Sequence, residues 1–256
     1  MKIRVLGAHN LESSDSKLVS LLVDDCIALD AGGLASGLSF SAQQKLIAIL
    51  LTHGHYDHIR DVPAIAMNLH NRGNSIDICA SSATYEMLST HLMDGKIYPN
   101  FFQQPADNPT VRFREMEHGK SERLGGYEVK AVSVNHSLPA IGYQITAADN
   151  KSLFYTGDTG ADLAECWKYM SPQLLIIEVT ASNKQASWVT PAKHLTPSQL
   201  KQELLEFQKQ KGYLPQILTV HMNPWFEAQI EKELAVVARE LGCSIKIGYE
   251  GMEFRL

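Results

Sequence analysis

Metal-binding side chains are concentrated in one short string, and this string constrains the chain more than any other feature. The pattern H-x-H-x-D-H occupies residues 53–58 and directly follows an apolar strand pattern. Side chains two apart in an extended segment point to the same side, so His53 and His55 can meet one metal ion where the strand ends. Asp57 and His58 then turn into a predicted helix, where they can meet a second ion. The string therefore predicts a site for two metal ions.

Three more candidate ligands follow apolar strand patterns elsewhere in the chain. His136, Asp158 and His221 each stand just past such a run. Loops gather at strand ends, and functional side chains collect there. Two ions about 3.5–4 Å apart are most simply joined by a bridging carboxylate and a bridging hydroxide, so a site for two ions needs ligands from several strand ends. These three residues are the candidates that supply them.

Strand and helix patterns alternate along both halves of the chain. We expect strands at 3–6, 18–23, 27–30, 47–51, 76–80, 111–116, 127–134, 141–147, 152–156, 174–179, 216–220 and 244–249. We expect helices at 60–70, 82–93, from about 161, at 197–210 and at 225–241, and an irregular loop at 95–110. Helices that arrive singly between groups of strands indicate sheets covered by helices on their outer faces, which is an α/β class of fold.

The composition disfavours several classes of protein. Lys and Arg number 23 against 28 Asp and Glu, a net charge of −5 with neutral histidine, whereas binding by phosphate neutralisation favours a basic excess. We therefore expect nucleic acid to be a poor partner. The N-terminal residues show no secretory signal pattern, and no apolar run reaches the ~18 residues of a membrane span. The four cysteines form no C-x-x-C pair and fit buried thiols, so we expect a cytoplasmic protein without membrane association.

Taken in order along the chain, these features resemble the metallo-β-lactamase fold superfamily over almost the whole sequence. The landmarks are a strand-ending acid at Asp30, the string 53–58, His136, Asp158 in a Gly-Asp-Thr turn, and His221. The segment 248–252 also looks like the last strand of that superfamily. The resemblance implies an αββα sandwich of two mixed β-sheets flanked by helices, formed by a single domain over residues 1–256.

The resemblance also implies a set of ligands. One ion takes His53, His55 and His136, the other takes Asp57, His58 and His221, and Asp158 bridges the two. Asp30 is expected behind the ligands, where it orients the ligand loop through hydrogen bonds. All these ligands offer nitrogen or oxygen, so we expect two Zn²⁺ ions, although Mn²⁺ or Fe would fit the same set.

Two further segments are similar to the phosphodiester-cleaving branch that contains ribonuclease Z and the class II cyclic-nucleotide phosphodiesterases. Glu178 stands in LLIIEVT and His194 in KHLTP, which resemble that branch's glutamate at a strand end and its His-x-Ser/Thr segment. The loop at 95–100 also looks like a class II phosphodiesterase segment. We therefore expect His194, Glu178 and Asp57 as catalytic residues, with His194 as the general acid that Glu178 orients.

The expected function is hydrolysis of a small phosphodiester, a 3′,5′-cyclic nucleotide above all, by attack of a metal-bridging hydroxide. A ribonuclease Z-like tRNA 3′-processing nuclease stays open, but it expects a long Gly/Pro-rich arm for which the chain offers no candidate segment. A lactonase, a thioesterase or a cyclic-phosphate phosphodiesterase of this fold also stays open, as does a non-catalytic metal- or signal-binding module. The oligomeric state is open as well, a homodimer included.

Overall fold

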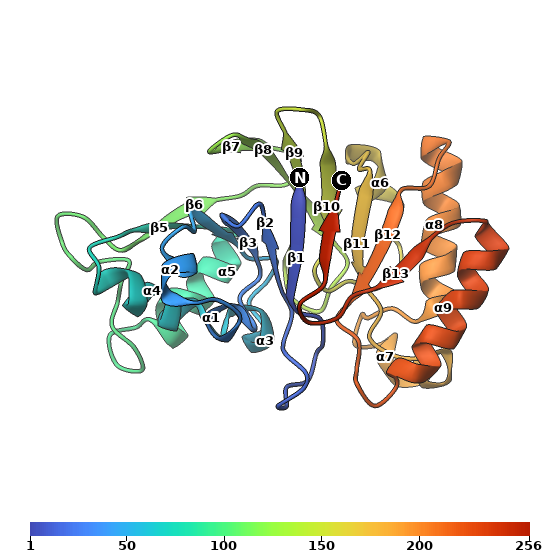
Figure 1. The fold of residues 1–256 in the computed structure, drawn as a ribbon, viewed down its shortest axis with the longest axis horizontal. Helices are drawn as coiled ribbons and strands as arrows, with labels where there is room; N and C mark the ends of the chain where they lie inside the picture. The colour runs from blue at the N-terminus through green and yellow to red at the C-terminus, as the bar shows by residue number, and fades with distance from the viewer.

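Two seven-stranded β-sheets face each other in the computed structural model, which describes all residues from 1 to 256 (Figure 1). The first sheet contains, in spatial order, β14 (Glu253–Arg255), β1 (Lys2–Gly7), β2 (Ser20–Val23), β3 (Ile27–Leu29), β4 (Ala48–Leu50), β5 (Ile76–Ala80) and β6 (Val111–Glu115). The second contains β13 (Ile245–Ile247), β12 (Gln216–Val220), β11 (Leu174–Glu178), β10 (Ser152–Tyr155), β9 (Ala140–Ala147), β8 (Tyr127–Val134) and β7 (Ser121–Leu124).

Helices lie on the outer side of each sheet (Figure 1). The first sheet carries α1 (Leu34–Gly37), α2 (Phe40–Gln43), α3 (Tyr56–Ile59), α4 (Val62–His70), α5 (Ser82–Met87) and the π-helical turn η1 (Leu88–Leu92). The second carries α6 (Ala164–Tyr169), the 3₁₀ turn η2 (Asn183–Gln185), α7 (Ala186–Val189), α8 (Pro197–Lys211) and α9 (Glu227–Leu241). The predicted αββα sandwich is confirmed. None of these helices combines the length and apolar character needed to cross a bilayer.

Strand direction brings several strand ends to one edge of the sandwich. β9 is antiparallel to both β8 and β10, so β8 and β10 run in the same direction. β10, β11 and β12 then pair in parallel. In the first sheet, β3 and β4 are parallel as well. The carboxyl ends of β8, β10, β11 and β12 therefore meet along one edge of the second sheet, and the loops that follow them lie close together.

Apolar side chains fill the space between the sheets and the space beneath the helices. Leu29 of the first sheet and Leu174 of the second belong to one cluster between the sheets. The next residue along β11, Leu175, points outward into a cluster under the helices of the second sheet. Both faces of each sheet are thus buried, which explains why the strand patterns in the sequence are nearly continuous apolar runs.

The helix expected at 60–70 is present as α4, and the separate short helix α3 precedes it over the last residues of the string 53–58. The structure corrects two other sequence predictions. The helix expected at 82–93 changes after Met87 into the π-helical turn η1. The segment 248–252 is a turn rather than the last strand, because Gly251 has a left-handed backbone with φ of 86° and the chain reverses there. The last strand is β14, which pairs antiparallel with β1.

Several short elements were not predicted at all. These are α1, α2, α3, β7, η2, α7 and β14, each three or four residues long. An element of this length contains about one helical turn or one strand alternation, too little for a periodic pattern to appear. All four cysteines are free thiols; Cys79 and Cys166 are buried as expected, whereas Cys26 and Cys243 are only partly buried.

Candidate active site

Functional side chains gather at the edge where the strand ends of the second sheet meet. His136 follows β8, Asp158 follows β10, Glu178 ends β11 and His221 follows β12. The string at 53–58 enters from the first sheet, directly after β4, and its side chains contact those of the second sheet. The structure thus brings together residues that are up to 168 positions apart in the sequence.

The first group of candidate ligands consists of three histidines and one carboxylate. The ligand atoms of His53, His55, His136 and Asp158 all lie within 4.8 Å of one another. His55 Nδ1 is 2.9 Å from His53 Nε2 and 3.1 Å from His136 Nε2. Asp158 Oδ2 is 3.7 Å from His53 Nε2. We call these four residues cluster 1.

The second group shares the same aspartate. The ligand atoms of Asp57, His58, Asp158 and His221 also lie within 4.8 Å of one another, and we call these residues cluster 2. Asp158 Oδ1 is 3.3 Å from His58 Nε2 and 3.3 Å from His221 Nε2. Asp158 therefore turns one oxygen toward each cluster, which is the geometry of a bridging carboxylate.

Cluster 2 contains buried polar atoms that the protein leaves without a hydrogen-bond partner. These atoms are His58 Nε2 and Asp158 Oδ1, which lie 3.3 Å apart but are not aligned as donor and acceptor. Nearly all buried polar atoms in native proteins have a partner, so an unpartnered pair needs an explanation. Four nitrogen and oxygen donors around one point are a donor set that a divalent cation satisfies. The residues of both clusters therefore fit divalent metal ions.

Electrostatics favour the same conclusion. Burial lowers the pKa of all three histidines of cluster 1, which keeps these imidazoles neutral, the form that binds a metal. At His58 burial also lowers the pKa, but the charges of Asp158 and Asp30 outweigh it and raise this pKa well above its usual value. Cluster 2 thus favours positive charge, which a bound divalent cation would supply.

Asp30 lies behind the ligands, fully buried at the end of β3. Its carboxylate accepts hydrogen bonds from His58 Nδ1 at 2.7 Å, from the Thr52 backbone N–H at 2.8 Å and from Tyr155 Oη at 2.7 Å. Asp30 has a left-handed backbone with φ of 55°, which is strained for a residue other than glycine. The surrounding hydrogen bonds hold this conformation, and it turns the carboxylate toward the ligand loop.

Glu178 and His194 form a second buried pair of carboxylate and imidazole. His194 Nδ1 donates to Glu178 Oε1 at 2.6 Å, and the Thr159 backbone N–H donates to the same oxygen at 3.0 Å. Burial lowers the pKa of His194, but the charge and hydrogen bond of Glu178 outweigh it and raise this pKa to about 9. His194 Nδ1 is 3.9 Å from Asp158 Oδ2, so the pair stands directly beside the two clusters.

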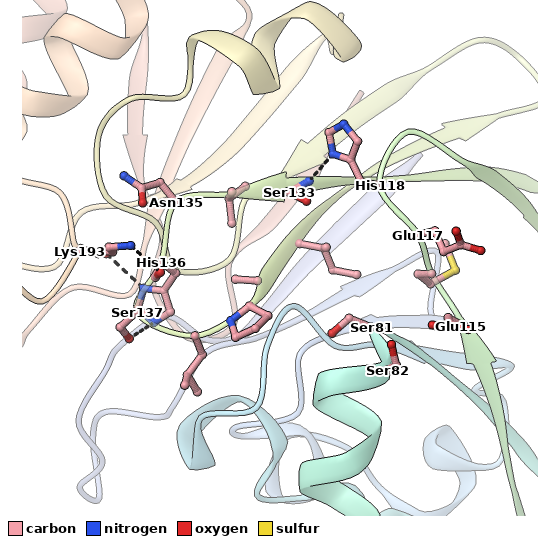
Figure 2. A pocket seen from close by; sticks show the side chains of 16 residues that line it. Ser81, Ser82, Glu115, Glu117, His118, Ser133, Asn135, His136, Ser137 and Lys193 are labelled. Carbon is pink, nitrogen blue, oxygen red and sulfur yellow. Dashed lines mark hydrogen bonds between the residues drawn. The ribbon is translucent and has the colours of Figure 1, made fainter.

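A cavity of about 640 Å³ opens beside cluster 1 (Figure 2). Figure 2 shows His136 and Lys193 at one end, with Glu115 and Glu117 at the other. Ligand pockets in proteins typically have volumes of about 300–1,000 Å³, so this cavity is large enough for a small molecule. Its position makes it the natural place for the part of a substrate that extends away from the clusters.

Several residues that hold the ligands were not predicted from the sequence. They are Thr52, Tyr155, Thr180 and, through its backbone carbonyl, Lys193. The two threonines stand beside residues that were predicted, one next to His53 and one two positions after Glu178, and this adjacency was a usable signal. Tyr155 looks like an ordinary strand residue, and Lys193, although it precedes the predicted His194, contributes only its backbone carbonyl, so only the fold reveals these two contacts.

Known proteins share both the sequence pattern and the fold. Residues 31–239 match the family model of the beta-lactamase superfamily domain. Among curated relatives, ribonuclease Z of Thermococcus kodakarensis is 28% identical over 112 residues, which are 43% of this chain and 33% of that protein. The 3′,5′-cyclic-nucleotide phosphodiesterase of Candida albicans is 28% identical over 87 residues, 34% of this chain and 20% of that protein. The matched stretches thus span a third or less of these relatives.

Among solved structures, unliganded yeast PDE1 has a TM-score of 0.86 at 15% identity, and the match covers 100% of this chain and 99% of that chain. The metallo-beta-lactamase fold protein YhfI of Bacillus subtilis also matches, with a TM-score of 0.78 at 18% identity over 99% of this chain and 98% of that chain. These likenesses extend over both sheets and show the shared fold. Together with the family match over most of the sequence, they lead to one conclusion. The chain belongs to the beta-lactamase superfamily and has the metallo-β-lactamase fold.

Proposed function

We propose that this protein is a dinuclear metal-dependent phosphodiesterase that hydrolyses a small 3′,5′-cyclic nucleotide. One observation carries the proposal: two ligand clusters share Asp158, and the His194–Glu178 pair stands directly beside them. The clusters supply the groups for metal-assisted hydrolysis, and the pair supplies a proton donor. A non-catalytic metal-binding module would have no need for such a donor.

Cluster 1 would hold one ion and cluster 2 the other, with Asp158 between them. Two Zn²⁺ ions are the first choice for these nitrogen and oxygen ligands, and Mn²⁺ or Fe would fit as well. When bound, such ions supply Lewis-acid stabilisation of the phosphoryl oxygens and a hydrolytic water of lowered pKa. Asp57 belongs to cluster 2, and its side chain is 31% exposed. It can therefore also contact the hydrolytic water.

His194 would give a proton to the leaving alkoxide. Its Nδ1 is engaged with Glu178, which leaves Nε2 free to act on a substrate. Glu178 fixes the ring orientation and favours the protonated form, as the raised pKa of His194 indicates. The ring also stacks on His221, with centroids 5.3 Å apart and planes at 17°. An acid held in this way loses little orientation freedom in the transition state.

The substrate preference follows from size and charge. A cavity of about 640 Å³ accommodates a nucleoside, and its far wall carries Glu115 and Glu117 rather than a row of cations. A polyanion would meet these carboxylates and a chain of net charge −5, whereas a cyclic nucleotide brings only one phosphate, which belongs at the clusters. The relationship to the phosphodiesterase of Candida albicans supports the same choice.

A ribonuclease Z-like nuclease is the second candidate. The observation that favours it is the match to ribonuclease Z of Thermococcus kodakarensis over 112 residues. Both candidates cleave phosphodiester bonds and would use the same clusters. They differ in whether a long RNA can approach, and the acidic far wall of the cavity opposes that approach.

A substrate screen on metal-loaded protein tests the proposal. Cyclic AMP, cyclic GMP, bis-p-nitrophenyl phosphate, a pre-tRNA and a lactone would be compared at equal enzyme concentration. We expect hydrolysis of at least one cyclic nucleotide and of bis-p-nitrophenyl phosphate. Efficient trimming of pre-tRNA with cyclic nucleotides left intact would establish the second candidate, and activity on the lactone alone would reject both.

A further inference from the structure

A buried threonine separates a carboxylate from a histidine in cluster 1. Thr52 Oγ1 donates to Asp30 Oδ2 at 2.9 Å and lies 3.0 Å from His53 Nδ1. The threonine is completely buried, so no water competes for its hydroxyl. The hydroxyl therefore connects the carboxylate to a histidine that Asp30 does not contact directly.

The same arrangement occurs in cluster 2. Thr180 Oγ1 donates to Glu178 Oε2 at 2.7 Å and lies 2.9 Å from His221 Nδ1. Thr180 is also buried. Each of the two buried carboxylates thus orients a pair of imidazoles: one imidazole is bound directly and the other through a threonine. The two threonines come from different sheets and serve different clusters.

The chemistry of the hydroxyl fixes the direction of these hydrogen bonds. Asp30 and Glu178 are surrounded by donors from the backbone and from side chains, so both carboxylates act as acceptors. A threonine has a single hydroxyl proton, and that proton points at the carboxylate. The oxygen can then only accept from the imidazole, so Nδ1 carries a ring proton and Nε2 is the nitrogen that remains for the cluster.

We propose that Thr52 and Thr180 are positioning residues that hold His53 and His221 in the Nδ1–H tautomer and so direct the Nε2 lone pairs to the metal sites. His221 Nε2 is 3.3 Å from Asp158 Oδ1 and His53 Nε2 is 3.7 Å from Asp158 Oδ2, so Nε2 of each ring faces its cluster. The inference rests on the two clusters of the proposed function. It adds that Thr52 acts mainly on cluster 1 and Thr180 mainly on cluster 2.

Histidine tautomers in the metal-free protein give the first test. Valine has nearly the shape of threonine but no hydroxyl, so Thr52→Val and Thr180→Val remove the hydrogen bonds and retain most of the packing. ¹⁵N NMR of the imidazoles should show Nδ1–H at His53 and His221 in the wild type. Thr52→Val should change His53 alone, Thr180→Val should change His221 alone, and the serine variants Thr52→Ser and Thr180→Ser should restore the wild-type tautomers.

Metal affinity gives the second test. Groups that orient metal ligands from behind typically contribute about 10–100-fold to affinity. In a titration against a chromophoric chelator, each valine variant should weaken one of the two binding constants by about that factor. The imidazole signals of His136 and His58 report which cluster has filled, so the weakened ion is expected in cluster 1 for Thr52→Val and in cluster 2 for Thr180→Val.

Thr110→Val is the matched control. Thr110 is buried, and its hydroxyl lies 3.0 Å from His70 Nδ1, a threonine–histidine pair that belongs to neither cluster. This variant should leave both metal constants and the ligand tautomers unchanged.

Three results would overturn the threonine proposal: unchanged tautomers in the valine variants, equal weakening of both ions by each variant, or serine variants that behave like valine. A wild-type protein that takes up no metal would instead overturn the proposed function. Because the tautomers are measured without metal, the two failures are distinguishable.

Discussion

The replacement His194→Ala separates protonation of the leaving group from every other contribution to hydrolysis. His194 is not required as a ligand, because the two clusters contain four donors each without it. Its removal should therefore leave the metal content unchanged. A ribose alkoxide is a poor leaving group and needs a proton in the transition state, whereas p-nitrophenolate leaves without one. The two substrates should consequently respond very differently to the same substitution.

The size of the effect follows from the geometry of the pair. A positioned general acid contributes about 10²–10⁴-fold to the rate. The 2.6 Å hydrogen bond to Glu178 and the stacking on His221 hold the His194 ring in one orientation. The contribution of His194 to the rate should therefore fall within this range. At 1.36 kcal/mol per factor of ten, the range corresponds to about 2.7–5.4 kcal/mol of transition-state stabilisation. For bis-p-nitrophenyl phosphate we expect a loss of less than about tenfold, because little proton transfer is needed.

The assay compares kcat for a cyclic nucleotide and for bis-p-nitrophenyl phosphate in the wild type and in His194→Ala, with the metal content measured for each sample. His118→Ala is the control, because His118 lines the same cavity but lies at its far end, where it accepts a hydrogen bond from the Ser133 backbone N–H. The control should change neither the metal content nor the ratio of the two rates. Equal losses on both substrates in His194→Ala, or a loss of metal, would refute the acid role.

Two other substitutions test the site and the scaffold. Asp158→Ala should lose more metal than any single histidine-to-alanine change, because Asp158 turns one oxygen toward each cluster. Metal analysis after gel filtration measures this loss. A histidine variant that loses more metal would contradict the position of Asp158 between the clusters. At His9, burial lowers the pKa, but Glu250 and Glu227 outweigh it and raise the pKa above 6.5. The stability from this pair is therefore fully present below pH 6.5 and is lost as the pH rises through the raised value. His9→Gln should flatten that decline in urea unfolding with chelator present, and an unchanged decline would show that the pair contributes nothing.

The candidate ligands could be predicted from the sequence because strand ends are visible in it. Each candidate is a polar residue directly after an apolar run, and parallel strands bring such positions to one edge. The string 53–58 also follows an apolar run, and it places four candidate ligands in a single segment. The His194–Glu178 pair was recognised through a resemblance to known segments, and its residues lie 16 positions apart, so spacing alone would not have joined them.

The remaining features depend on contacts that a pattern does not contain. The π-helical turn after Met87 and the turn at 248–252 interrupt patterns that looked regular in the sequence. Thr52 and Thr180 matter because neighbouring strands of one sheet place each hydroxyl between a carboxylate and an imidazole. That placement becomes visible only in the three-dimensional structure. In the sequence, the one indication is that both threonines stand close to predicted site residues.

The number of metal ions per chain tests the central proposal most directly. Protein purified without chelator and reconstituted with Zn²⁺ or Mn²⁺ would be analysed by elemental mass spectrometry against its amino-acid content. We expect two equivalents per chain, because clusters 1 and 2 each present four donor atoms and share only Asp158. A stoichiometry that stays at one equivalent after reconstitution with either metal would contradict the dinuclear site.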